Sequence, residues 1–77
     1  MKPPDATLDA KGLSCPLPVV KARLEIDKLA SGGVLQVLAT DPGSVSDFAN
    51  WTKMSGHELL DSSVEGDVYT YLIRKGA

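Results

Sequence analysis

Four segments of the chain carry apolar patterns typical of β-strands. Residues 6–10 alternate between apolar and polar, as a short half-buried strand would, and residues 34–39 form a nearly continuous apolar run with β-branched content. Such a run is typical of a central strand that helices cover. Residues 58–64 and 68–74 flank a turn at 65–67, and the second of them is rich in the Val, Tyr, Thr and Ile that favour strands. The pattern predicts four strands.

Two further segments space their apolar residues as amphipathic helices do. The first, residues 16–30, opens with a proline suited to the first helical turn and is followed by a pair of glycines where a C-terminal cap is expected. The second, residues 45–55, gathers its apolar residues on one face and stops before a glycine. Ser44 and Asp47 resemble a capping box for this helix, with Asp in place of the more usual Glu.

The order of these elements, β-α-β-α-β-β, predicts an α/β two-layer sandwich. Its economical form is a four-stranded mixed sheet with both helices on one face, which leaves the other face partly open to solvent or to a partner. A chain of 77 residues supports one core and not two, so we expect residues 1–77 to form a single domain. Residues 1–5 precede the first strand and are expected to be a disordered tail.

Composition and charge narrow the function mainly by what they exclude. Hydrophobic residues make up 43% of the chain and charged residues 23%, as in an ordinary globular protein. A formal charge of −2 leaves no basic surface for a phosphate backbone, so we expect no direct nucleic-acid partner. No apolar run approaches the roughly 18 residues of a membrane span, and no signal peptide is recognisable. We therefore expect a cytoplasmic protein without a membrane partner.

The residues with evident chemistry gather at positions 12–18, in the sequence Gly-Leu-Ser-Cys-Pro-Leu-Pro. Pro16 suits the start of a helix, which places Cys15 at the N-cap, and Pro18 stiffens the same turn. Unpaired backbone N–H groups and the helix dipole favour a thiolate there, so we predict a lowered pKa for Cys15. A thiolate of this kind is suited to accept sulfane sulfur and hold it as a persulfide.

Other interpretations of Cys15 arise from the same residues. It could be a structural N-cap in a non-catalytic regulatory or interaction module. A small thiol redox protein is disfavoured because Pro18 stands where a Cys-x-x-Cys motif has its second thiol. A Cys/His hydrolase is disfavoured because no acidic residue is spaced to orient His57. One cysteine and one histidine also fall short of a zinc site, so no metal is predicted.

At the level of family, the chain resembles the TusA, or SirA-like, sulfur carriers over roughly residues 7 to 76. A Cys-Pro-x-Pro motif that follows a short strand and Gly-Leu in so small a chain is specific to this family. The residues that carry the resemblance are Leu8-Asp9-Ala10-x-Gly12-Leu13-x-Cys15-Pro16-x-Pro18-Val19, Asp41-Pro42, His57-Glu58-Leu59 and Tyr69-x-Tyr71-Leu72-Ile73-Arg74-Lys75.

The resemblance implies the same two-layer fold and a role in sulfur relay. Cys15 would take the persulfide, with Pro16 and Pro18 shaping its turn and no cofactor beyond the covalent sulfur. The donor would be a cysteine desulfurase or a rhodanese-type protein, and the acceptor would serve tRNA thiolation, molybdenum-cofactor biosynthesis or sulfur oxidation. Such a protein is a sulfurtransferase-type carrier rather than a turnover enzyme, and we expect a monomer.

A second apolar stripe on the first predicted helix is a candidate partner surface. Leu17, Val20 and Leu24 point away from the stripe assigned to the core, with positive charge nearby. An exposed apolar patch beside the thiol would let the carrier dock on another protein, although the stripe could instead pack against a local loop or the N-terminal tail. Arg23 and Asp41 are candidates for steering contacts near the thiol, against the alternative that both are plain solvated charges.

Overall fold

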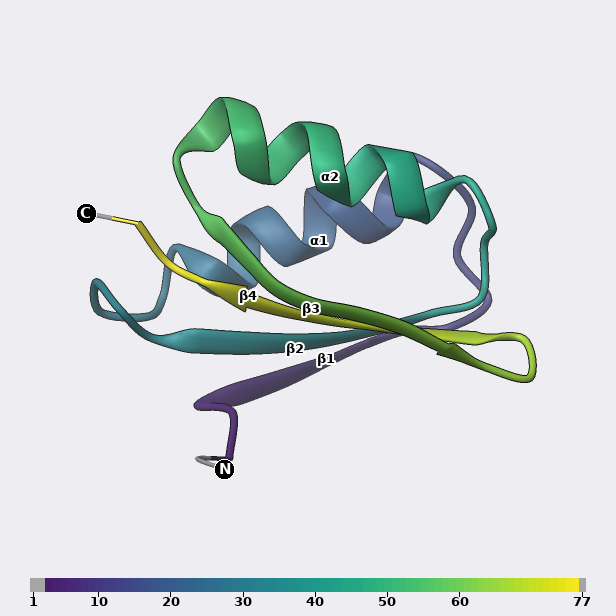
Figure 1. Cartoon of the computed structure of the whole chain (residues 1–77), viewed down its shortest axis with the longest axis horizontal. Coiled ribbons are helices and arrows are strands. Elements are labelled where there is room, and N and C mark those ends of the chain that lie inside the picture. Colours follow the sequence, from purple (N-terminus) through teal and green to yellow (C-terminus); the bar gives the residue numbers. More distant parts are fainter. Residues whose placement is uncertain (1–2, 77) are drawn as a thin grey trace.

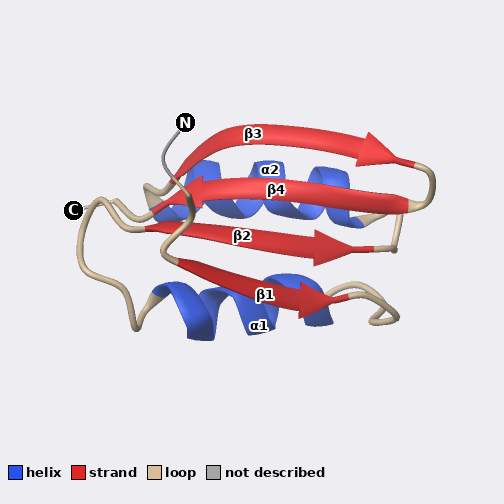
Figure 2. Ribbon diagram, turned by 90° about the horizontal axis from the view of Figure 1, so that it is seen from below, coloured by secondary structure: helices blue, strands red, loops and turns tan. Residues whose placement is uncertain are grey.

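The predicted strands form one mixed sheet in the computed structural model, which describes residues 3–76. Strand β1 covers Ala6–Ala10, β2 Val34–Ala39, β3 Glu58–Glu65 and β4 Val68–Arg74. Their order across the sheet is β1-β2-β4-β3, with β1 parallel to β2 and the other neighbours antiparallel (Figure 2). The parallel pair makes the loops that follow β1 and β2 leave the sheet at the same edge.

Both helices lie on one face of this sheet, as the sequence predicts. Helix α1 covers Leu17–Ile26 and α2 covers Ser44–Ser55. Figures 1 and 2 show the two helices side by side in one layer with the four strands in the other. The predicted α/β two-layer sandwich with β-α-β-α-β-β order is confirmed. None of the helices in the described part of the chain is long and apolar enough to cross a membrane.

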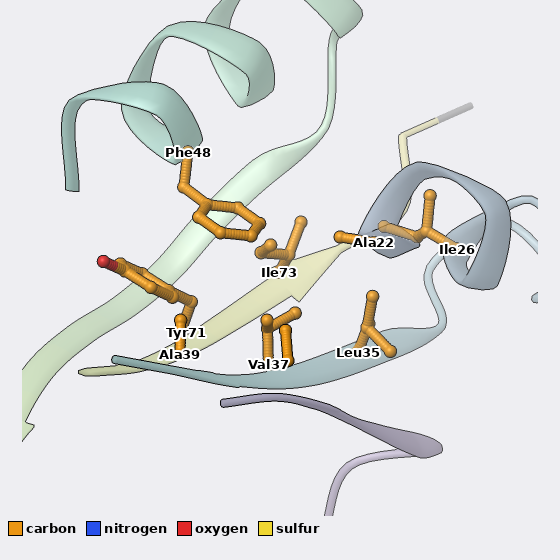
Figure 3. Close-up of a cluster of buried hydrophobic side chains, with 9 residues drawn as sticks. Ala22, Ile26, Leu35, Val37, Ala39, Phe48, Tyr71 and Ile73 are labelled. Atoms are coloured by element: carbon orange, nitrogen blue, oxygen red, sulfur yellow. The ribbon is translucent and has the colours of Figure 1, made fainter. Parts of the chain in front are cut away.

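The core lies between the sheet and the helices (Figure 3). Along β2 every second residue is fully buried, because alternate side chains of a strand point to opposite faces. Phe48 of α2 stacks on Tyr71 of β4, with the ring centroids 4.6 Å apart. The fully buried hydrophobic residues are Ala10, Ala22, Ile26, Leu35, Val37, Ala39, Phe48, Tyr71 and Ile73.

The opposite face of the sheet is only partly covered. Gln36 and Leu38 of β2 and Thr70 and Leu72 of β4 point to this face and are half-buried. Thr7 on the neighbouring strand hydrogen-bonds through its hydroxyl to the Gln36 side chain. The expectation of a partly open sheet face is confirmed, because these residues of β2 and β4, two polar and two apolar, are only half-buried.

Helix α1 ends at Ile26, four residues before the predicted end at residue 30. The Lys75 ammonium donates to the carbonyl oxygens of Leu29 at 2.7 Å and Asp27 at 3.3 Å, both in the segment that follows the helix. The same loop is tied to the residue after β4, since the Gly32 N–H donates to the backbone carbonyl oxygen of Lys75 at 2.9 Å. The two side-chain contacts of Lys75 span 46 and 48 residues, beyond the reach of a local pattern.

The capping box predicted at Ser44 is wrong. Ser44 is the first residue of α2, after Gly43 at the N-cap, and its hydroxyl is buried against the Tyr71 hydroxyl at 2.7 Å. No side chain caps the helix, which leaves the Asp47 carboxylate available for another contact.

The expectation of a disordered tail over residues 1–5 is wrong for Asp5. Its N–H donates to the Val34 carbonyl at 2.8 Å, and its carboxylate accepts the Val34 N–H at 2.8 Å. Asp5 therefore extends the β1–β2 pairing by one residue. Met1 and Lys2 lie outside the described residues.

Candidate functional site

Cys15 is exposed on the loop between β1 and α1, at the sheet edge where β1 and β2 both end. Ala10 and Ala39 are paired at the ends of these parallel strands, so the two following loops start side by side. The Gly12 N–H donates to the Thr40 hydroxyl at 2.9 Å, which holds the two loops together. The carboxyl end of parallel strands is where α/β sheets commonly place their functional residues.

The backbone around Cys15 starts helix α1 one residue later than predicted. Pro16 is the N-cap and Leu17 the first helical residue, so the placement of Cys15 at the N-cap is wrong. The Cys15–Pro16 peptide bond is cis, and Pro18 is fully buried in the first turn of α1. A proline is tolerated there because the first N–H groups of a helix have no partner within it. Both prolines thus lie in the turn that displays the thiol.

Asp41 links the second loop to Cys15. One of its carboxylate oxygens accepts the Cys15 backbone N–H at 2.7 Å, and the other accepts the Gly43 N–H at 3.3 Å. Asp41 was predicted as a steering contact near the thiol, and the structure brings it to that position. It engages the backbone of Cys15, so its first effect is to fix the loop that carries the sulfur.

Asp47, in the first turn of α2, is the residue that contacts the sulfur itself. The Cys15 thiol donates a hydrogen bond to one Asp47 carboxylate oxygen. Sequence reasoning missed this contact, because Asp47 was assigned to a capping box and lies 32 residues from Cys15. One signal in the sequence could have predicted the contact. If β1 and β2 pair in parallel, the loop after β1 and the start of α2 lie at the same sheet edge, and Asp47 is the acidic residue in the first turn of α2.

These acidic neighbours raise the pKa of the Cys15 thiol above its ordinary value. The hydrogen bond to Asp47 is the largest cause, followed by desolvation and by the negative charges of Asp47 and Asp41. The prediction of a lowered pKa is therefore wrong. It assumed that the start of α1 dominates the field at the sulfur, whereas the helix begins two residues later and neither carboxylate forms an ion pair within the described residues.

The apolar stripe on α1 is exposed, as expected for a docking surface. Leu17, Val20 and Leu24 keep 47%, 46% and 61% of their surface in contact with solvent, so they do not pack against a loop of the described chain. We call these three residues the α1 patch. The patch begins two residues after Cys15, on the helix that the cysteine loop leads into.

The structure does not bring Arg23 to the thiol. Arg23 lies about two turns into α1, where it lines a groove with Asp27 and residues from the end of α2, among them Trp51 and Met54. Its predicted role as a steering contact near Cys15 is therefore not supported by a contact with the thiol in the structure.

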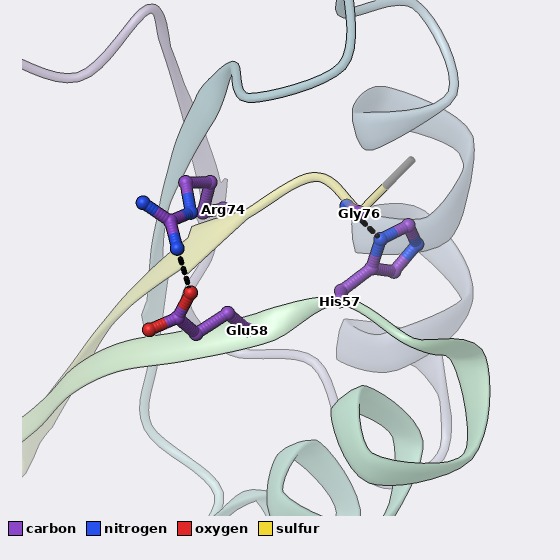
Figure 4. Close-up of polar contacts among 4 residues, drawn as sticks. All are labelled: His57, Glu58, Arg74 and Gly76. Atoms are coloured by element: carbon purple, nitrogen blue, oxygen red, sulfur yellow. Dashed lines mark hydrogen bonds and ion pairs between the residues drawn. The ribbon is translucent and has the colours of Figure 1, made fainter.

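His57 directly precedes β3 and lies beside Gly76 near the end of the chain (Figure 4). The strand register places it at the opposite end of the sheet from Cys15. It precedes β3, whose first residue, Glu58, pairs with Arg74 beside the start of β2. Cys15 follows the other end of the sheet, and β2 alone spans about 20 Å between these edges at ~3.3 Å per residue. His57 Nδ1 accepts the Gly76 N–H at 3.0 Å. A Cys/His hydrolase is not supported.

A metal site at Cys15 would require further ligand side chains beside the sulfur. In residues 3–76 no three His, Cys, Asp or Glu side chains come together in a way that could hold a metal ion. Cys15 itself is exposed, so a group of another molecule can reach its sulfur.

Fold and site together define a two-layer α/β domain that displays its one thiol on the turn before its first helix. The family model for sulfurtransferase TusA matches residues 6–75. The chain belongs to this family, and the resemblance seen in the sequence is confirmed.

Similar proteins carry related names and the same fold. A sulfur carrier protein TusA from Allochromatium vinosum is 49% identical, covering 92% of this chain and 93% of the relative. A putative sulfur carrier protein from Halobacterium salinarum is 53% identical, covering 90% and 86%. The crystal structure of a SirA-like protein from Desulfitobacterium hafniense superposes with a TM-score of 0.81 at 27% identity, covering 94% of this chain and 99% of that one.

Proposed function

We propose that this protein is a sulfur carrier that holds sulfane sulfur as a persulfide on Cys15 and passes it from one protein to another. Membership of the TusA family supports the proposal, as do relatives named sulfur carriers. The observation that carries it is the exposure of the sole cysteine on a turn braced by two prolines and a second loop. A carrier needs its sulfur to enter another protein's active site, and this display permits that.

The transfer is a thiol–persulfide exchange that needs no oxidant. Cys15 sulfur bonds to the outer sulfur of a donor R–S–SH, the donor S–S bond breaks, and the products are Cys15–S–SH and R–SH. Delivery repeats the exchange, with the carrier as donor. Suitable donors are a cysteine desulfurase or a rhodanese-type protein, and the acceptor serves tRNA thiolation, molybdenum-cofactor biosynthesis or sulfur oxidation. We expect the carrier to act as a monomer in the cytoplasm.

A purely structural cysteine is the competing interpretation. An N-cap side chain would accept a hydrogen bond from the first helical turn, but α1 has no side-chain cap and the Cys15 thiol donates to Asp47 instead. The observed contacts therefore favour the carrier over an interaction module in which Cys15 merely caps a helix.

Loading of Cys15 is tested by intact mass spectrometry. The protein is incubated with a cysteine desulfurase and cysteine, or with a rhodanese and thiosulfate. We expect a mass gain of one sulfur atom that reductant removes and that Cys15→Ser abolishes. A protein that gains no sulfur from either donor, while a control carrier thiol is loaded, would contradict the proposal.

A further inference from the structure

We propose that Asp47 is the proton acceptor and donor of sulfur transfer at Cys15, an inference that rests on the sulfur-carrier function proposed above. The geometry is direct, since the thiol hydrogen of Cys15 is donated to the Asp47 carboxylate. A group that accepts a proton in catalysis must lie within hydrogen-bond reach of it, and Asp47 meets this requirement. Cys15 makes no side-chain contact with His57, which hydrogen-bonds at the far end of the sheet.

The position of Asp47 is set by elements that do not depend on the thiol. It is half-buried in the first turn of α2, and the next residue, Phe48, is fully buried against Tyr71. On the other side, Asp41 holds the Cys15 backbone N–H at 2.7 Å. The sulfur and the carboxylate are therefore presented to each other by the core and by the loop after β2.

The two acids have different tasks in this arrangement. Asp41 contacts the backbone of Cys15 and fixes the loop, so it is a positioning residue. Asp47 contacts the reacting sulfur and is the catalytic residue. A thiol whose pKa is raised carries its proton at neutral pH, and that proton must leave before the sulfur can form a new bond.

The proton can complete a closed path within the exchange. As Cys15 sulfur attacks the outer sulfur of the donor R–S–SH, its proton passes to the Asp47 carboxylate. The donor S–S bond breaks with its electron pair on the departing sulfur, and protonated Asp47 returns the proton to that R–S⁻, giving R–SH. Asp47 ends as it began, ionised, and no oxidant or reductant is consumed.

A passive role for Asp47 predicts the opposite effect of its removal on the rate of sulfur transfer. If Asp47 only held the thiol neutral, its removal would release more thiolate and would speed every reaction of Cys15. If it relays the proton, its removal speeds simple alkylation, where no leaving thiolate needs that proton, but slows sulfur transfer. Comparing the two reactions in one variant separates these roles.

The experiment compares the wild-type chain with Asp47→Asn, Asp47→Glu and Asp61→Asn. Asp61 is exposed on β3, and its substitution controls for the loss of one negative charge. Sulfur loading from glutathione persulfide is followed by intact mass, alkylation by iodoacetamide is followed in parallel, and both are measured across pH. Circular dichroism and thermal melting check that each variant is folded.

We expect Asp47→Asn to load at least about tenfold more slowly at neutral pH, within the range of general acid–base effects, and to regain rate as pH rises. The same variant should be alkylated faster than wild type. Asp47→Glu should recover part of the loading rate, because it keeps a carboxylate, and Asp61→Asn should load like wild type.

Loading of folded Asp47→Asn as fast as wild type or faster would overturn the role of Asp47 while leaving the carrier function in place. Failure of the wild-type chain itself to gain sulfur would overturn both. A slow Asp47→Asn that is not rescued by Asp47→Glu or by high pH would also overturn the proton role, since a structural defect would account for it.

Discussion

At the scale of single residues, two carboxylates favour the protonated form of the Cys15 thiol. Asp41 holds its backbone and Asp47 accepts its thiol hydrogen, and together they favour the neutral thiol. A neutral, hydrogen-bonded thiol reacts slowly with small electrophiles, because the thiolate is the nucleophile. We therefore expect the free Cys15 thiol to react slowly with small electrophiles at neutral pH.

The raised pKa predicts the pH dependence of simple alkylation at Cys15. Below its pKa a thiol loses about tenfold in thiolate for each pH unit, so the alkylation rate should reach half its maximum at a higher pH than free cysteine does. Asp41→Asn should lower that midpoint, and Asp47→Asn should lower it more, since Asp47 is the larger cause. Iodoacetamide rates across pH measure it, and a wild-type midpoint at or below that of free cysteine would contradict the electrostatic account.

At the scale of elements, helix α1 connects the turn that carries Cys15 to the exposed α1 patch. Its buried face carries Ala22 and Ile26 into the core, and its other face exposes the α1 patch beside the thiol. One helix therefore anchors the turn in the fold and leaves an exposed apolar surface, on which we propose that a donor or acceptor protein docks.

The α1 patch is tested by a double substitution, Val20→Ser with Leu24→Ser. We expect sulfur transfer from a desulfurase to slow by about tenfold or more, because losing apolar contact weakens docking. Loading from glutathione persulfide should be unchanged, since a small donor does not need the patch. The matched control is Val64→Ser, which removes an apolar side chain that is 58% exposed. Val64 lies on β3, the edge strand at the opposite side of the sheet from β1. Equal desulfurase rates for the double variant and this control would remove the patch from the account.

Elements were predictable where local pattern decides them, and less so where distant residues do. The strands follow from periodicity, and the turn at Cys15 follows from its two prolines. Lys75 binds the loop that follows α1 from the other end of the chain, and the contact of Asp47 with Cys15 depends on the parallel pairing of β1 and β2. The prediction of a lowered pKa for Cys15 was wrong for the same reason. It considered the nearby start of α1 but not Asp41 and Asp47, which the fold brings to the thiol from distant parts of the sequence.

Stability rests on one thin core at the scale of the whole molecule. The sheet has helices on one face only, so few side chains are fully buried and each contributes strongly. Phe48 connects α2 to the sheet, stacking on Tyr71 and meeting the Trp51 ring edge-on at 5.9 Å. The helix that carries Asp47 is thereby fixed by the packing of its neighbour in the sequence.

Replacing Phe48 should therefore cost much of the stability. We expect Phe48→Ala to lower the free energy of unfolding by about 3–5 kcal/mol, out of the roughly 5–15 kcal/mol typical of a domain. Met54→Ala, on the same helix but 87% exposed, should change it by less than about 0.5 kcal/mol. Urea unfolding measures both, and similar losses for the two variants would show that α2 is not held by Phe48.

Discharge of the loaded protein tests the carrier function most directly. Wild-type protein bearing one extra sulfur is purified from its donor and mixed with an acceptor thiol, and the masses of both are followed over time. We predict that the protein returns to its unloaded mass while the acceptor gains one sulfur atom for each one that the protein loses. Sulfur that stays on the protein, or that is found on a residue other than Cys15 by peptide mapping, would contradict the account.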